Sequence, residues 1–285
     1  MTEMITSGQI KQFRRLTEDA LGGEVNITKK EAQRALGRGN EIMEEFISLI
    51  REKAGNPHKR TSSDYGYPKG YTGAKELDEQ ATILREQYQF PLKPLASVKK
   101  LPEGAEGLWV IPLIKDIVSL QCEHPYNYAV DFVLERLERN RKFKNWRRGK
   151  TGYEYLRQSE RTLRLWSQLT LAQGNGELTR VVPAQFGKMH KGESVDYVRE
   201  DVLDNEILFG VYHIGVMLLT HPEREQVWEQ LHIDCAGDEY TPGGDDKFVS
   251  APLFYWDDGK LHFNDCWTRI DINQYGSVSG FVPQN

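Results

Sequence analysis

The chain has 285 residues, a formal net charge of −5 from 37 basic and 42 acidic residues, and 39% hydrophobic residues. The length allows one large domain or a main domain with an appendage. The apolar residues are clustered along the chain, which excludes a disordered polymer. A net charge of this sign excludes a globally basic surface, so any nucleic-acid binding must rely on a local basic patch.

The cysteine content and the first residues indicate a compartment. Cys122, Cys235 and Cys266 are odd in number and have no CxxC spacing, which argues against a disulfide framework and favours a reducing environment. The sequence MTEMITSGQIKQF has no basic segment followed by an apolar segment, and no stretch is long enough to cross a bilayer. We therefore expect a soluble cytoplasmic protein that has no membrane partner.

Residues 1–55 are predicted to form an N-terminal helical segment. Apolar residues recur at helical spacing from Ser7, and Thr28 to Glu31 has the form of a capping box that opens a second helix. Residues 56–73 are rich in Gly, Pro and Tyr and are predicted to be a loop or linker. The main domain is then expected to span residues 74–285.

The first part of this main domain is mostly helical in pattern. Three segments are predicted as helices because their apolar residues recur every three or four positions. They are Leu77 to Tyr88, a segment that starts at Asn127, and Leu156 to Leu169. Short apolar runs at 108–111 and 178–182 are predicted as strands.

The longest apolar run, Ile207 to Leu219, is the expected centre of the fold. It is rich in β-branched and aromatic residues, so we interpret it as a buried central strand or strand pair, with a buried helix as the alternative. Thr220 to Glu223 repeats the capping-box form and predicts a short helix through Val227 and Trp228.

The last stretch is β in character. Segments 253–256 and 260–263 flank Asp257-Asp258-Gly259, a strong hairpin signal, and residues 275–281 form a further strand or an ordered tail. The order of elements predicts an α+β fold, with a helical N-terminal half packed on a mainly antiparallel sheet formed by the C-terminal half.

Several peptides together resemble a known family. They are LPEGAEG (Leu101 to Gly107), RQSERT (Arg157 to Thr162), VVPAQFG (Val181 to Gly187), MLLTHPER (Met217 to Arg224), DCAGDEY (Asp234 to Tyr240) and YGSVSGFVPQ (Tyr275 to Gln284). This set is similar to a family of uncharacterised cytoplasmic proteins predicted in small-genome candidate-phylum bacteria. The resemblance implies a self-contained bacterial protein, and it implies no activity, ligand or site residue.

An acidic cluster follows a predicted strand at Asp234 to Tyr240. Carboxylates at strand ends suit a metal-assisted hydrolase, for which the candidate catalytic residues are Asp238, Glu239, His213 and His232. The alternative is that these Asp and Gly residues only form turns. The spacing matches neither an EF-hand nor a two-His zinc signature, so no metal ligand and no cofactor are assigned.

Two cysteine assignments stay open in the sequence. Cys235 is either a nucleophile with a histidine partner or a small buried residue of the core, and the second is favoured. In one interpretation, the His, Asp and Cys of residues 262–266 are metal ligands together with Cys235. A closed zinc site would need a second pair, which is not evident.

The basic stretch Arg136 to Lys150 is the sharpest charge feature. Cations beside aromatic rings are typical of single-stranded nucleic-acid sites. The candidate binding residues are Arg139, Arg141, Lys144, Trp146, Arg147, Arg148 and Tyr153. The competing interpretation is a helix end whose cations complement the helix dipole and pair with acidic residues of the protein.

Two function classes therefore remain. The first is a non-catalytic binding protein that presents the basic-aromatic segment Arg139 to Tyr155, with the Tyr65 to Tyr71 loop as an optional addition, to an anionic partner such as nucleic acid, or to another protein. The second is the hydrolase. The sequence has no Gly-rich phosphate loop and no GxSxG elbow, it does not decide whether the protein is an enzyme, and it predicts no oligomeric state.

Overall fold

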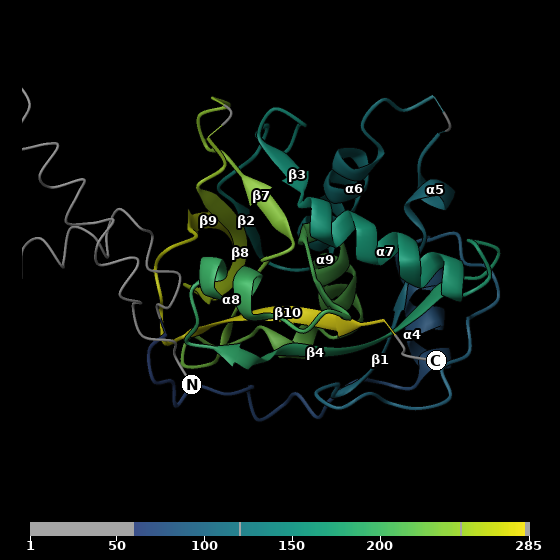
Figure 1. Ribbon diagram of the computed structural model, residues 1–285, viewed down its shortest axis with the longest axis horizontal. Helices are drawn as coiled ribbons and strands as arrows, with labels where there is room; N and C mark the ends of the chain where they lie inside the picture. Colours follow the sequence, from purple (N-terminus) through teal and green to yellow (C-terminus); the bar gives the residue numbers. More distant parts are fainter. Residues whose placement is uncertain (1–59, 120, 246, 283–285) are drawn as a thin grey trace, which may run out of the picture. The chain divides into compact units, whose positions relative to one another are not determined.

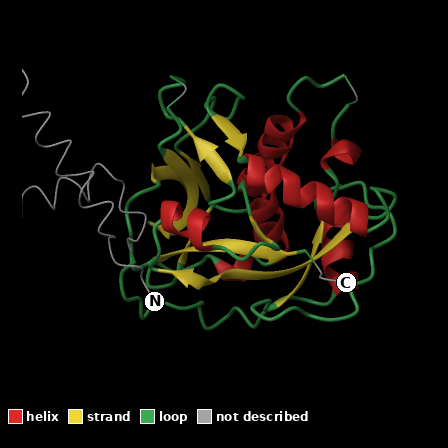
Figure 2. Ribbon diagram, in the orientation of Figure 1, coloured by secondary structure: helices red, strands yellow, loops and turns green. Residues whose placement is uncertain are grey.

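The computed structural model describes residues 60–119, 121–245 and 247–282 (Figure 1). This part of the chain is α+β: it combines α-helices with a ten-stranded mixed sheet (Figure 2). The predicted N-terminal helical segment, residues 1–55, lies outside the described residues.

The strands of the sheet are β1 (Gly107–Ile111), β2 (Phe143–Asn145), β3 (Leu156–Gln158), β4 (Arg180–Lys191), β5 (Glu206–Leu208), β6 (His232–Asp234), β7 (Asp238–Tyr240), β8 (Ser250–Asp257), β9 (Lys260–Trp267) and β10 (Tyr275–Phe281). The main path of the sheet is β1-β4-β10-β6-β8-β7-β3, while β5 pairs with β10 and β9 pairs with β8 and β2. The C-terminal strand β10 thus lies inside the sheet.

The α-helices of the described part are α4 (Leu77–Thr82), α5 (Ile114–Ile117), α6 (Pro125–Asn140), α7 (Glu160–Ala172), α8 (Val195–Asp201) and α9 (Val211–Thr220). A π-helical turn, Ile83–Gln87, continues α4, and a 3₁₀ turn, Pro222–Arg224, follows α9. None of these helices is both long and apolar enough to cross a membrane.

The sheet draws on more of the chain than the sequence predicts. β1 comes from the first half, and the pairings of β10 with β6 and of β2 with β9 are parallel. The α+β class is therefore correct, while strands and helices are not divided between two halves of the chain.

The longest apolar run is not a strand along its whole length. Its start forms β5, but residues from Val211 onward form α9, whose ten residues are all buried. A helix that is apolar on every side is stable only when it is covered all round. Gly215 permits close packing against α6, since a Cβ there would lie 2.8 Å from Val133 Cγ1. The helical alternative is thus the correct one for this segment.

Most other predicted elements are present, with two revisions. Residues 156–169 divide into β3 and α7, and Ser159 caps α7 by accepting a hydrogen bond from the Thr162 N–H. The helix predicted through Val227 and Trp228 is wrong, because only the 3₁₀ turn forms there. The predicted hairpin is confirmed as β8 and β9, and the positive φ angles of Asp258 (46°) and Gly259 (67°) fit its tight turn.

The two faces of the sheet differ in chemistry. One face and the helices α6, α7 and α9 share the main apolar core (Figure 2). On the other face α8 contributes to a small second cluster of buried apolar residues: Val195, Val198, Leu208, Ala236 and Ala251. The remaining residues of this second face are mostly polar or aromatic, and we call it the polar face.

Candidate functional site

The predicted basic segment spans the end of α6, strand β2 and the following turn. Most of its arginines contact groups of the protein itself: Arg139 pairs with Glu135, Arg148 with Glu138 and Arg147 with Asp265. Arg141 donates a hydrogen bond to the Glu225 carbonyl oxygen. This geometry matches the alternative in which the cations pair with the acidic residues of the chain.

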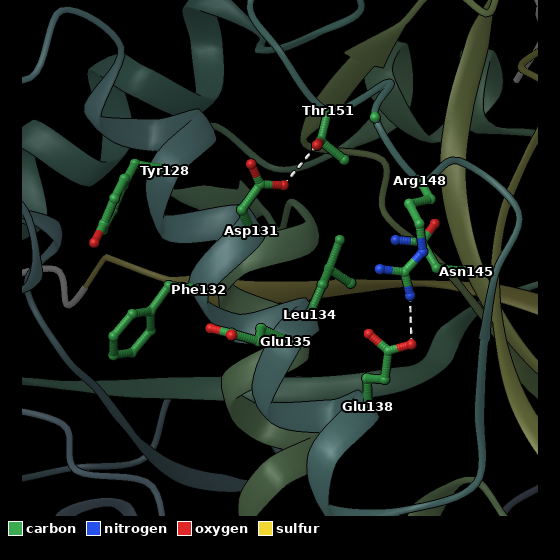
Figure 3. Close-up of a pocket in the computed structure, with 10 residues that line it drawn as sticks. Tyr128, Asp131, Phe132, Leu134, Glu135, Glu138, Asn145, Arg148 and Thr151 are labelled. Carbon is green, nitrogen blue, oxygen red and sulfur yellow. Dashed lines mark hydrogen bonds and ion pairs between the residues drawn. The ribbon is translucent and has the colours of Figure 1, made fainter.

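A shallow pocket of about 340 Å³ lies beside this segment (Figure 3). Figure 3 shows Arg148 extended toward Glu138, and Thr151 beside Asp131 on the exposed side of α6. Asp131, Glu135 and Glu138 outnumber the single arginine in the lining. An excess of carboxylates does not suit a phosphate, so we do not place an anionic partner in this pocket.

Lys144 and Trp146 lie on β2 and just after it. The Lys144 ammonium is 4.7 Å from the centre of the Trp146 ring, and the indole Nε1–H donates to His262 Nδ1 at 2.9 Å. The Trp146 side chain remains 52% exposed. A hydrogen bond therefore fixes the orientation of a ring that is about half exposed.

Further rings continue from Trp146 across the polar face. Residues paired across neighbouring strands share one face, and the register places His262 opposite Tyr255 and His232 opposite Tyr275. The ring centres are 4.7 Å apart for Tyr255 and His262, 6.1 Å for His232 and Tyr255, and 5.3 Å for His232 and Tyr275. We call these four residues the aromatic row.

An exposed tryptophan adjoins the row at each of two positions. Trp146 contacts His262, and Trp228, which is 47% exposed, has its ring 5.3 Å from that of His232. The two histidines are buried, whereas Tyr255 and Tyr275 are partly exposed. The arrangement is a set of rings held by buried polar partners and open to solvent at the tryptophans.

His232, a candidate catalytic residue, belongs to this row. Its Nδ1 lies 2.6 Å from Glu225 Oε1, and the other carboxylate oxygen of Glu225 is 3.1 Å from Arg224 Nη1. All three side chains are fully buried. Arg224 also donates to the carbonyl oxygens of Phe186 and Leu231, at 2.8 and 2.7 Å. This network holds the histidine ring beneath Trp228.

Asp238 lies elsewhere, at the start of α9. Its carboxylate accepts a hydrogen bond from the Val211 N–H at 2.8 Å, and both oxygens lie 2.7 Å from the Tyr126 hydroxyl, which donates to them. Burial raises the pKa of Asp238 to about 7, although the hydrogen bonds from Tyr126 and Val211 oppose that rise. A Cβ on Gly210 would lie 2.1 Å from Asp238 Oδ1, so only glycine fits there.

Glu239 and His213 occupy two further environments. Glu239 accepts from Arg157 Nε at 2.8 Å at the surface. The His213 ring stacks on Trp166, with centres 4.0 Å apart, and burial together with the charge of Arg180 lowers its pKa well below the usual value. No hydrogen bond or ion pair of the described residues joins the four candidate catalytic residues to one another.

The described part of the chain contains no group of three or more His, Cys, Asp or Glu residues arranged to hold a metal ion. Cys235 is fully buried, and burial together with Asp238 and Asp234 raises the pKa of its thiol well above the usual value. A thiol held in its neutral form is a poor nucleophile, which agrees with the core assignment. Cys122, Cys235 and Cys266 are all free.

The amino-acid pattern alone does not mark the tyrosines of the row as neighbours. Tyr255, His262 and Tyr275 stand in segments predicted as strands, and alternation indicates which residues of one strand share a face. The register between strands, which brings these rings together, depends on long-range pairing that the sequence pattern does not contain.

No family model, no curated protein and no solved structure matches this chain. The resemblance to uncharacterised bacterial proteins stays a prediction. The candidate sites therefore rest on the geometry of the residues themselves.

Proposed function

We propose that the protein binds single-stranded nucleic acid on the polar face of its sheet, over Trp146, Lys144 and the aromatic row. The observation that carries this proposal is the succession of rings across β2, β9, β8, β6 and β10, bordered by two tryptophans that are about half exposed. Aromatic rings on a sheet surface stack on unpaired bases, because every base has a π-face.

Stacking is expected to supply more of the affinity than charge does. Four arginines of the segment are already engaged with the protein, whereas Lys142 and Lys144 are exposed beside the row. If only these two lysines neutralise phosphates, the slope of log K against log salt concentration should be about −1.4, since single strands give about −0.7 per phosphate contact. A slope of several units would show that a larger basic surface is involved.

The first test measures binding of a fluorescently labelled single-stranded oligothymidylate to the full chain by fluorescence anisotropy. Trp146→Ala should weaken binding about 5- to 150-fold, since stacking on one ring contributes about 1–3 kcal/mol. Trp267→Ala is the matched control, because Trp267 is also 52% exposed but faces away from the row. Equal affinities of the two variants, or no binding by the native chain, would exclude this surface.

A second measurement separates the row from the paired arginines. Lys144→Glu should weaken binding, because its ammonium is adjacent to the stacking ring, whereas Arg148→Glu should have a smaller effect because Arg148 already pairs with Glu138. The opposite order of effects would move the interface to the end of α6.

A further inference from the structure

A second pocket, of about 670 Å³, lies apart from the aromatic row. It is formed by the starts of α6 and α7 together with β3, β7 and the turn before β3. The volume falls within the roughly 300–1,000 Å³ that is typical of small-molecule sites. We propose that this pocket binds a small zwitterion that carries a planar ring, of the size and chemistry of an aromatic amino acid.

Two arginines supply the anion-binding side. Arg157 is held by its Nε bond to Glu239 and by stacking of its guanidinium 3.8 Å from the centre of the Phe248 ring. The Nε bond is the sole hydrogen bond of this guanidinium to the described residues, so both Nη groups remain to bind a carboxylate. Arg161 donates from Nη2 to the Leu203 carbonyl oxygen, and its buried Nε has no hydrogen-bond partner in the described part of the chain.

A neutral side chain adds a further donor to the lining. The Nε2 of Gln158 is buried and has no hydrogen-bond partner among the residues that the structure describes. Gln158 follows Arg157 in the chain and also lines the pocket. A buried N–H without an acceptor is costly, and a ligand carboxylate would satisfy it.

Two carboxylates supply the cation-binding side. Glu123 and Glu160 line the pocket, and neither forms an ion pair within the described residues. Glu239 is neutralised by Arg157. The pocket lining thus contains Arg161, the free Nη groups of Arg157 and two carboxylates that form no ion pair within the described residues. Glu123 and Glu160 are exposed, so water hydrates them in the empty pocket. A ligand ammonium would exchange this water for charge-assisted hydrogen bonds while the ligand carboxylate meets the arginine and Gln158 donors, so a zwitterion uses both sets of groups.

A flat surface completes the site. The rings of His124 and Tyr153 stack with centres 4.7 Å apart and planes 8° from parallel, and the Tyr153 side chain is 53% exposed. Tyr126, which is anchored by its bonds to Asp238, forms another part of the wall. A planar ligand ring can extend this stack, since offset aromatic pairs contribute about 0.5–1.5 kcal/mol beyond the area that they bury.

The test uses isothermal titration calorimetry of the full chain with four probes. L-phenylalanine carries both charges and the ring, L-phenylalanine amide lacks the carboxylate, N-acetyl-L-phenylalanine lacks the ammonium, and L-alanine lacks the ring. We expect L-phenylalanine to bind, and the amide and the N-acetyl analogue to bind about 10- to 100-fold more weakly, as removal of one charged hydrogen-bonding partner predicts. L-alanine should also bind more weakly, because it cannot stack on the rings of the pocket.

Variants assign each charge to its residue. Arg161→Gln should weaken the binding of L-phenylalanine but not that of the amide, which has no carboxylate to lose. Glu160→Gln should weaken the binding of L-phenylalanine but not that of the N-acetyl analogue, which has no ammonium to lose. Arg164→Gln is the control, because Arg164 lies on α7 outside the pocket lining. Melting temperatures of the variants show that each is folded.

Two results would overturn the proposal. The first is that millimolar L-phenylalanine gives no binding heat, or binds no better than its amide and N-acetyl analogues. The second is that the relative affinities for the four probes are the same in Arg161→Gln and Glu160→Gln as in the Arg164→Gln control. Neither result depends on whether the aromatic row binds nucleic acid.

Discussion

His190 on β4 is a buried histidine held between two glutamates. Its Nδ1 is 2.9 Å from Glu193 Oε2, and its Nε2 is 2.7 Å from Glu206 Oε1. Burial acts to lower the pKa of His190, but the hydrogen bonds and charges of the two glutamates outweigh burial and raise that pKa to about 9. At neutral pH this residue is therefore an imidazolium that pairs with two buried carboxylates, and Arg60 supplies a second positive charge beside Glu193.

This pKa predicts a pH-dependent contribution to the free energy of unfolding. The folded-state pKa lies above the unfolded value of about 6.5, so the stabilisation is complete below about pH 6.5 and is lost as the pH rises through about 9. His190→Gln should lower the free energy of unfolding by about 3–5 kcal/mol at pH 6, because it leaves the buried Glu206 without a cation, whereas Glu193 keeps its pairing with Arg60.

Urea denaturation from pH 6 to pH 10 checks this prediction. The difference between the native chain and His190→Gln should shrink as the pH rises from about 6.5 to about 9 and be smallest above about pH 9. The exposed His124→Gln serves as the control for loss of a histidine. A difference that stays constant over the whole range would mean that His190 does not carry the charge.

At the scale of elements, the contact of α6 with α9 sets how the buried helix is held. Gly215 on α9 faces Val133 on α6, and a Cβ at position 215 would lie 2.8 and 3.0 Å from the two γ-carbons of that valine. A Cβ atom essentially never lies closer than 3.0 Å to another side-chain carbon, so a side chain at position 215 would force the helices apart. The helices therefore approach as closely as they do because residue 215 has no side chain.

Gly215→Ala should therefore destabilise the fold by about 1–3 kcal/mol through overpacking, although alanine is the better helix former by about 1 kcal/mol. Val133→Ala makes space for the new methyl group. The double variant should be more stable than the sum of the two single effects predicts, by about 1 kcal/mol or more, in a denaturation double-mutant cycle. Additive effects would show that the two positions do not meet.

At the scale of the whole molecule, the last strand completes the sheet. β10 pairs with β4, β5 and β6, and β6 connects it to the hairpin of β8 and β9. The C-terminal residues therefore join parts of the sheet that lie on either side of them. The sheet cannot be completed until nearly the whole chain is present.

Truncation after Gln274 should remove cooperative folding, because three pairings of β10 are lost together. We expect the truncated chain to show no cooperative thermal transition by circular dichroism, with the full chain as the reference. A sharp transition in the truncated chain would show that the remaining strands form a stable sheet without β10.

Local elements could be predicted because short-range interactions specify them. The apolar spacing of α6 and the Asp-Gly turn between β8 and β9 each encode one structure through neighbouring residues. Residues 207–219 do not, since a run that is apolar on every side is compatible with a buried strand or a buried helix. In the folded chain, residues from Val211 onward form a helix that is buried along its whole length and packs closely on Val133.

Long-range packing also decided which candidate residues meet. The basic segment and the acidic cluster were visible as composition, but the pairing of Arg148 with Glu138 and the capping of α9 by Asp238 depend on how distant segments pack. The sequence by itself determined the α+β class, the local elements and the candidate residue types. Strand register and helix packing, which join residues far apart in the chain, alone decided the aromatic row and the pocket beside Arg161.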